Sequence, residues 1–162
     1  MTFTIEEGYA PGCIGRIAQL HAQHYARSSG FGVLFEAKVA QDLARFCTAF
    51  EPERDGLWLA RAPEIEGSIA IDGSRACEDG AHLRWFITSD VLRGQGVGRL
   101  LLARALAFAD ARGYRSVHLS TFAGLDAARH LYESHGFRLV QQSPGSTWGT
   151  AVDEQRFVRG LA

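Results

Sequence analysis

Alternating glycines occur in the segment Arg93-Gly94-Gln95-Gly96-Val97-Gly98, between an apolar stretch that predicts a strand and a longer stretch that predicts a helix. Glycine has no Cβ, so a ligand can approach the main chain of such a segment closely. The first amides of the following helix have no partner inside the helix, and together with the helix dipole they attract an anion. The segment therefore predicts a phosphate or diphosphate site, to which Arg93 and Arg99 can add charge-assisted hydrogen bonds.

The glycine pattern differs from two widespread phosphate-binding motifs. A dinucleotide fingerprint, G-x-G-x-x-G, would need a glycine at position 99, where this chain has Arg99. A P-loop would need a Gly-Lys-Ser/Thr triplet, and the only lysine of the chain is Lys38 in a different setting. Two interpretations of the segment remain. It is either a phosphate site of another kind or a tight turn that binds no ligand.

Hydrophobic periodicity predicts elements in the order β-α-α-β-β-β-α-β-α-β-β. The predicted strands are 2–6, 57–60, 67–71, 83–88, 116–121, 137–141 and 148–158, and the predicted helices are 14–27, 36–50, 98–112 and 127–134. We expect mobile loops at 28–32 and 72–80 and a turn at Ser143-Pro144-Gly145. Three strands precede the first crossover helix, so we expect a mixed sheet, antiparallel early and parallel around helix 98–112.

Composition narrows the class of protein. The 162 residues suit a single domain spanning 1–162. Hydrophobic residues make up 46% and the formal net charge is −1, which argues against disorder and against binding of nucleic acid or a membrane surface by bulk charge. Cys13, Cys47 and Cys77 form no CxxC pair, so neither a zinc site nor a disulfide framework is expected. The chain shows no signal-peptide pattern, which favours a cytoplasmic protein.

Two motifs resemble those of the GNAT superfamily of N-acetyltransferases. Arg93-x-x-Gly96-x-Gly98 resembles the superfamily's acetyl-CoA diphosphate signature, Gln/Arg-x-x-Gly-x-Gly/Ala. Segment 127–137, which contains Tyr132, is similar to the superfamily's Ala-x-x-x-Tyr-x-x-x-Gly-Phe block. Segment 119–128 further resembles acetyltransferase domains that are sometimes fused behind a MarR-type DNA-binding domain. The order of predicted elements also agrees, so the resemblance covers nearly the whole chain.

The resemblance implies an α+β fold of α/β-sandwich type. Its mixed, mostly antiparallel sheet would have about seven strands and about four helices, with a splay between the fourth and fifth strands. Acetyl-CoA would be the co-substrate, with no metal. Its diphosphate would be held by Arg93, Gly94, Gln95, Gly96, Val97, Gly98 and Arg99. Its pantetheine arm would pair with the backbone of Phe86, Ile87 and Thr88 like an added strand.

The resemblance also implies that Tyr132 protonates the leaving thiolate. Many members of the superfamily carry an asparagine seven residues before this tyrosine, where the present chain has Leu125. Asp126 and Thr121 are candidates to replace the contact that the asparagine would make.

The group that would deprotonate the acceptor amine is not evident from the sequence. A backbone amide of 83–88 can polarise the thioester carbonyl, whereas His82, His118 and Glu36 are candidate general bases, each with a structural role as the alternative. His21 and His24 are three residues apart on a predicted helix and would suit a metal pair. No third ligand is evident nearby, so no metal is expected.

The resemblance places the acceptor pocket under the first two helices and the final hairpin, which implicates Tyr25, Phe31, Phe35 and Trp148. An aromatic slot suits an amine on an apolar or aromatic body, although ordinary core packing is the alternative. The expected acceptor is the amine of a small molecule, an amino acid or a peptide, and a homodimer is one expectation. Alternatives are a non-catalytic acyl-CoA-binding regulatory module and, more weakly, O-acetyl or longer acyl transfer.

Overall fold

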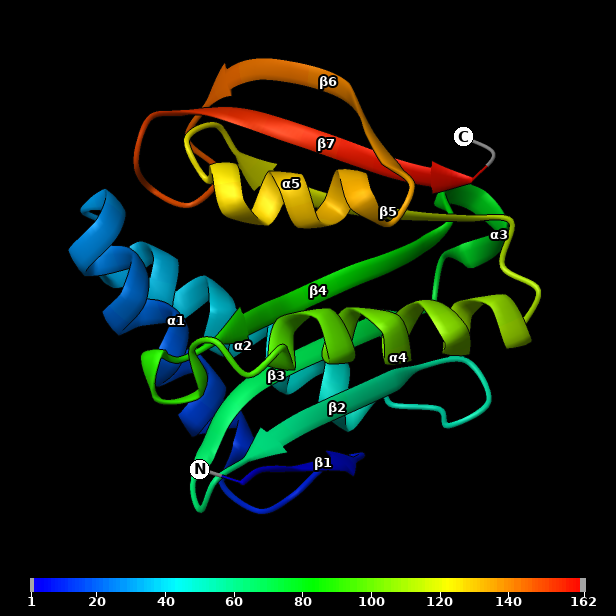
Figure 1. Cartoon of the computed structure of the whole chain (residues 1–162). Helices are drawn as coiled ribbons and strands as arrows, with labels where there is room; N and C mark the ends of the chain where they lie inside the picture. The colour runs from blue at the N-terminus through cyan, green and yellow to red at the C-terminus, as the bar shows by residue number, and fades with distance from the viewer. Residues whose placement is uncertain (1, 161–162) are drawn as a thin grey trace.

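The strands of the chain form one seven-stranded sheet in the order β1-β2-β3-β4-β5-β7-β6 (Figure 1). The computed structural model describes residues 2–160. The elements are β1 (Thr4–Glu7), α1 (Cys13–Ser29), α2 (Val33–Thr48), β2 (Gly56–Arg61), β3 (Ile65–Asp72), α3 (Ala76–Asp79), β4 (Ala81–Thr88), the 3-10 turn η1 (Asp90–Leu92), α4 (Val97–Ala111), β5 (Ser116–Phe122), α5 (Asp126–Ser134), β6 (Phe137–Gly145) and β7 (Val152–Gly160). The predicted order of strands and long helices is confirmed.

The central pair of strands, β4 and β5, is parallel, whereas all other neighbouring strands are antiparallel. The two strands pair only at Ala81 with Val117 and at His82 with His118, and then diverge (Figure 1). Helix α4 provides the crossover that a parallel pair requires. The mixed sheet and its splay between the fourth and fifth strands are therefore confirmed.

Each face of the sheet is covered by a separate hydrophobic core. Helices α4 and α5 cover one face, and α1 and α2 cover the other (Figure 1). Along β2 the side chains alternate between the two cores: Leu57 and Leu59 face α1 and α2, whereas Trp58 and Ala60 face α4. This is the two-residue period of a strand that is buried on both faces.

The C-terminal hairpin differs from its prediction. β6 continues through Gly145, so the turn expected at Ser143-Pro144-Gly145 is wrong, and the chain reverses over 146–151 instead. Pro144 pairs with Asp153 at the edge of the sheet, where a residue without an N–H is tolerated. The second strand consequently begins at Val152 rather than at Trp148, which lies in the connecting loop.

The two segments predicted as mobile loops, 28–32 and 72–80, both include residues of helices or strands. α1 ends at Ser29, and its C-cap Gly30 has a left-handed backbone (φ 71°) whose N–H donates to Ala26 O in the last turn; the buried Phe31 follows. Segment 72–80 contains the short helix α3, next to which Arg75 forms ion pairs with Glu78 and Asp79. Within residues 2–160, none of the helices combines the length and the apolar character needed to cross a membrane.

Candidate active site

The glycine-rich loop leads into α4, whose first backbone amides have no hydrogen-bond partner within the helix. Gly94 (φ 78°) and Gly96 (φ 73°) both have left-handed backbone, and Gly96 is the N-cap of α4 without a capping side chain. The amide of Leu100 donates to Gly96 O at 3.0 Å, so the amides of 97–99 precede the first bond of the helix. A Cβ built on Gly94 or Gly96 would meet no atom within 4 Å. This open, donor-rich helix start has the geometry of an anion site.

The first turn of α4 lies close to β4 and α5. A Cβ built on Gly98 would lie 3.6 Å from Phe86 Cζ, and 3.9 Å from both Leu131 Cδ2 and Thr88 Cγ2. The side chain of Arg93 is exposed and paired with Asp90 of η1. Arg99 is exposed on the first turn of α4. Of the residues predicted to hold a diphosphate, Arg93, Gly94, Gly96 and Arg99 are exposed to solvent, whereas Val97 is buried.

Strand β4 contains a bulge that alters the direction of its backbone. Ser68 pairs with Ile87 and Ala70 pairs with Arg84, so Trp85 and Phe86 together face a single residue of β3. Trp85 has a positive φ of 48°, an unusual conformation for a bulky residue that typically costs about 1–3 kcal/mol. Ser68 Oγ donates to Trp85 O at 2.6 Å and holds the bulge in place.

Beyond the bulge, the edge of β4 that faces β5 is free of strand pairing. The last pair between the two strands is His82 with His118, so within residues 2–160 the main chain of Phe86, Ile87 and Thr88 has no strand partner on that side. The Ile87 side chain is buried on the α1 and α2 side of the sheet, whereas Phe86 faces α5. An extended ligand arm could therefore add to this edge as a strand does.

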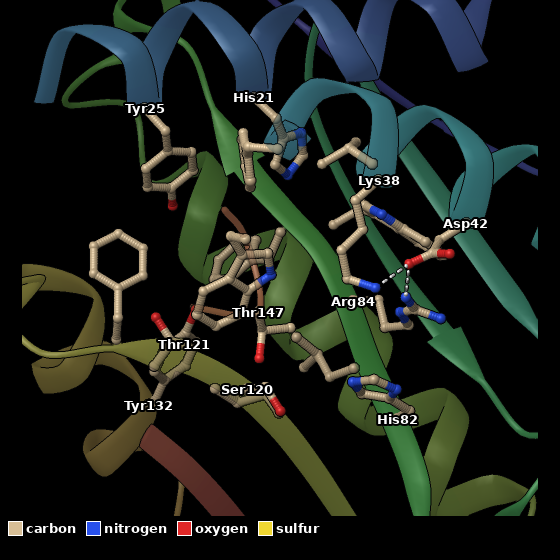
Figure 2. A pocket seen from close by; sticks show the side chains of 18 residues that line it. His21, Tyr25, Lys38, Asp42, His82, Arg84, Ser120, Thr121, Tyr132 and Thr147 are labelled. Carbon is tan, nitrogen blue, oxygen red and sulfur yellow. Dashed lines mark hydrogen bonds and ion pairs between the residues drawn. The ribbon is translucent and has the colours of Figure 1, made fainter. Parts of the chain in front are cut away.

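A pocket of about 300 Å³ lies where β4 and β5 diverge. Side chains from α1, α2, β4, β5, α5 and the β6–β7 loop surround it (Figure 2). The lining residues are His21, Tyr25, Phe35, Lys38, Val39, Asp42, His82, Leu83, Arg84, Trp85, Phe86, Leu119, Ser120, Thr121, Phe122, Tyr132, Thr147 and Trp148. Its volume is at the lower end of the range for small-molecule sites.

Aromatic side chains form one part of the pocket wall. Of the four predicted acceptor residues, Tyr25, Phe35 and Trp148 line the pocket. Phe31 does not line it, but lies directly behind, with its ring centroid 5.0 Å from that of Phe35 and 5.9 Å from that of Tyr25. Phe122 of β5, which the sequence did not single out, completes this wall.

Tyr132 reaches the pocket from α5. Its ring centroid lies 6.1 Å from that of Phe86 and 6.0 Å from that of Phe157. Burial raises the pKa of Tyr132, so its hydroxyl stays protonated at neutral pH and can donate. Of the two residues considered as replacements for an asparagine at position 125, Thr121 lines the pocket, whereas Asp126 is exposed outside it.

Only one of the three candidate bases, His82, lines the pocket. Burial and the charge of Arg84 lower the pKa of His82 to about 2, so the ring is neutral at physiological pH. His118 stacks behind it with ring centroids 4.4 Å apart, and its Nδ1 accepts from Arg156 at 3.2 Å. Glu36 is exposed on α2 and does not line the pocket.

A second imidazole, His21, also lines the pocket. Its Nδ1 lies 2.8 Å from Ile17 O and must donate there, which leaves Nε2 as an acceptor. Burial lowers the pKa of His21 to about 4. His24, whose spacing from His21 would suit a metal pair, does not line the pocket. In the described part of the chain, no group of three or more His, Cys, Asp or Glu side chains is arranged to hold a metal ion.

Sequence reasoning missed a charged group in the pocket. Lys38 and Asp42 of α2 and Arg84 of β4 all line it, with Asp42 Oδ2 3.0 Å from Lys38 Nζ and 3.3 Å from the Arg84 guanidinium (Figure 2). Two signals were present in the sequence. Arg84 is the one charge in the apolar stretch 83–88, and Lys38 and Asp42 have the four-residue spacing of neighbours on a helix.

Comparison with known proteins gives consistent matches. The model of the acetyltransferase (GNAT) family matches residues 34–137. Human N-acetyltransferase 8B is 31% identical over 100 residues, which cover 59% of this chain and 44% of that protein. The N-acetylaspartate synthetase of Danio rerio is 33% identical over 98 residues, covering 60% of this chain and 34% of that protein. The chain thus spans less than half the length of these two relatives.

A solved structure extends the likeness to the whole fold. The structure of yncA from Salmonella typhimurium with its cofactor acetyl-CoA superimposes with a TM-score of 0.76, covering 100% of this chain and 95% of that one at 18% sequence identity. At this identity the comparison shows a shared fold.

Proposed function

The chain belongs to the acetyltransferase (GNAT) family, and we propose that it transfers an acetyl group from acetyl-CoA to the primary amine of a small molecule, amino acid or peptide. One observation carries the proposal. The pocket lined by Tyr132 lies where β4 and β5 diverge, next to the unpaired edge of β4, and a Cβ built on Gly98 of α4 would lie 3.6 Å from Phe86 at that edge. A long, flexible ligand with an anionic end and a reactive end fits this continuous arrangement.

The residues present fit acetyl-CoA. The backbone of 94–99 would hold its diphosphate, since the amides of 97–99 precede the first hydrogen bond of α4 and no side chain caps them. The main chain of Phe86, Ile87 and Thr88 would bind the pantetheine arm along the free edge of β4. Arg93 and Arg99 would contribute positive charge at the mouth. When bound, acetyl-CoA supplies an activated thioester.

The pocket offers each of the groups that acyl transfer to an amine requires. The acceptor nitrogen forms a bond to the acetyl carbon as the carbon–sulfur bond breaks. Backbone amides at the bulge of β4 would stabilise the negative charge that develops on the carbonyl oxygen. Tyr132, kept protonated by burial, would donate its proton to the leaving thiolate.

A neutral imidazole would take up the proton that the acceptor amine loses. His21 and His82 both line the pocket, and burial keeps both rings neutral. His21 is the better placed of the two, because its bond to Ile17 O leaves Nε2 as the free acceptor. A low pKa makes either ring a weak base, so transfer through a water molecule to solvent suits this arrangement.

Replacement of Tyr132 by phenylalanine tests the proposed chemistry. Tyr132→Phe keeps the ring but removes the donor, so kcat should fall by about 10²-fold or more. The Kd for acetyl-CoA should stay within about threefold, since only the hydroxyl is removed. Thiol release with a panel of amines measures kcat, and calorimetry measures Kd. Tyr9→Phe, at an exposed tyrosine outside the pocket, is the matched control. An unchanged kcat in Tyr132→Phe would contradict this role.

A non-catalytic acyl-CoA-binding module is the second candidate. Leu125 stands where many members of the superfamily carry asparagine, and no carboxylate other than the paired Asp42 lines the pocket. This candidate predicts that acetyl-CoA binds but that no amine in the panel causes thiol release. Amines that also carry a hydroxyl group extend the test to O-acetyl transfer. Comparison of acetyl-, propionyl- and succinyl-CoA in the same assay separates acetyl from longer acyl transfer.

A further inference from the structure

The pocket has two chemically different ends. Tyr25, Thr121 and Tyr132 lie at one end, and Lys38, Arg84 and Asp42 gather at the other (Figure 2). Lys38 and Arg84 reach the same oxygen, Asp42 Oδ2, from two separate elements. A single carboxylate therefore holds two cationic side chains at one wall of the pocket.

The charges at this end do not balance. Lys38 and Arg84 contribute two positive charges to the pocket wall, and Asp42 contributes one negative charge. Asp42 is shared further, because Arg45 approaches its other oxygen at 3.5 Å from outside the pocket. Arg84 has one more carboxylate neighbour, Asp72, at a longer 3.8 Å. The pocket wall thus carries a net positive charge.

Arg84 is also held rigidly in a partly dehydrated position. Its side chain is 25% exposed, and its guanidinium lies 4.2 Å from the ring centroid of Trp85. Burial lowers the pKa of Arg84 in spite of Asp42 and Asp72, so these carboxylates do not replace all the hydration that the guanidinium has lost. An incoming anion would complete its set of partners, and a guanidinium binds carboxylates with two parallel hydrogen bonds.

We propose that the acceptor is an amino acid, whose free carboxylate binds Lys38 and Arg84 while its apolar or aromatic side chain packs against Tyr25, Phe35 and Trp148. The inference rests on the proposed function and specifies the acceptor of the same site. A pocket of about 300 Å³ that also admits the acetyl group leaves room for one small acceptor. A polyamine would bring further positive charge to Lys38 and Arg84, and an amine inside a longer peptide has no free carboxylate beside it.

Matched acceptors with and without the carboxylate test the proposal. Phenylalanine and phenethylamine share the ring and the amine and differ in the carboxylate. The wild-type chain should show a kcat/KM for phenylalanine at least about tenfold above that for phenethylamine, as a charge-assisted contact implies. Phenylalanine amide, which keeps the size of the acid but not its charge, should behave like phenethylamine.

Variants assign this preference to the two cations. Arg84→Gln and Lys38→Gln should each lower the phenylalanine-to-phenethylamine ratio of kcat/KM by roughly tenfold. Arg45→Gln is the matched control, because it removes a positive charge next to Asp42 from outside the pocket and should keep the wild-type ratio. Lys38 is partly exposed on α2, so Lys38→Gln decides the question if Arg84→Gln does not fold.

A binding measurement gives a readout independent of turnover. Trp85 lies against Arg84, and Trp148 lines the pocket, so intrinsic fluorescence in the presence of CoA should report acceptor binding. Phenylalanine should bind the wild-type chain at least about tenfold more tightly than phenethylamine does, and Lys38→Gln should reduce this difference.

Two outcomes overturn the inference and leave the proposed function intact. Thiol release that is equally fast with phenylalanine and phenethylamine would show that the carboxylate is not recognised. A phenylalanine-to-phenethylamine ratio of kcat/KM that is unchanged in Lys38→Gln would show that Lys38 does not bind the carboxylate. Failure of the proposed function looks different: acetyl-CoA would not bind, or every amine in the panel would leave the thioester intact.

Discussion

Gly96→Glu is the sharpest test of the anion site at the start of α4. Gly96 has a φ of 73°, and a Cβ there would meet no atom within 4 Å. The conformational cost of a residue other than glycine is therefore the main loss of stability, about 1–2 kcal/mol. For a chain of this length the melting temperature should fall by roughly 2–8 °C, and the variant should fold.

The effect on acetyl-CoA should be larger than the effect on folding. A glutamate at this position brings a negative charge to the place where the diphosphate would bind. Two like charges about 4 Å apart repel by about 1 kcal/mol in water and about 4 kcal/mol at the effective dielectric constant of a protein surface. The Kd measured by calorimetry should therefore rise by roughly fivefold to several hundredfold. Gly96→Ala, which has the same backbone cost and no charge, should bind more tightly than Gly96→Glu.

The opposite end of α4 provides a matched control. Gly113 has the same φ of 73° and the same open surroundings. Gly113→Glu should lose at least as much stability as Gly96→Glu, because a negative charge is unfavourable near the C-terminus of a helix and favourable near its N-terminus. Its affinity for acetyl-CoA should equal that of the wild type. Equal affinities of Gly96→Glu and wild type would refute the anion site, and equal losses in both variants would trace the effect to folding.

Two further variants test other features of the site. Gly98→Ala should keep its acetyl-CoA affinity within about threefold and lose no stability, because the added Cβ makes only ordinary contacts of 3.6–3.9 Å; a large loss of affinity would mean that the ligand passes closer to this residue. Burial lowers the pKa of His21 from its ordinary value of 6.5 to about 4. The unfolded chain therefore binds more protons between these values, and the free energy of unfolding should fall as the pH drops through this range. By pH 5, His21 should have lowered the free energy of unfolding by about 2 kcal/mol. Urea denaturation at pH 7.5 and pH 5 measures this change, which should be smaller in His21→Gln than in the wild type. An equal change in both would contradict the role of His21.

The parts of the molecule that local sequence determines could be predicted. The glycine-rich loop could be recognised because left-handed turns and open helix starts depend on adjacent residues. Short apolar stretches bounded by turn-forming residues predicted the central strands correctly. The turn at Ser143-Pro144-Gly145 was wrong, because pairing with β7 at the sheet edge outweighs the local preference of these residues for a turn.

The details of the pocket depend on residues that are far apart in the sequence. Arg84 meets Asp42 across 42 positions, and Ser68 fixes the bulge at Trp85 across 17. The contact between His82 and His118 follows from the register of a parallel pair, which no short motif encodes. Single residues such as Glu36 therefore could not be assigned to the pocket or excluded from it by sequence alone.

In the proposed function, the divergence of β4 from β5 would separate the region that binds the donor from the region that binds the acceptor. The opening arises from the course of the main chain, so exchanging one side chain can reshape it but neither creates nor closes it. In the proposed function the donor would bind along 86–99, whereas the acceptor would bind in the pocket that α1, α2, β4, β5, α5 and the loop 146–151 line. Substitutions in α1, α2 and the loop 146–151 would then change which acceptor the pocket prefers and leave the donor site along 86–99 unchanged.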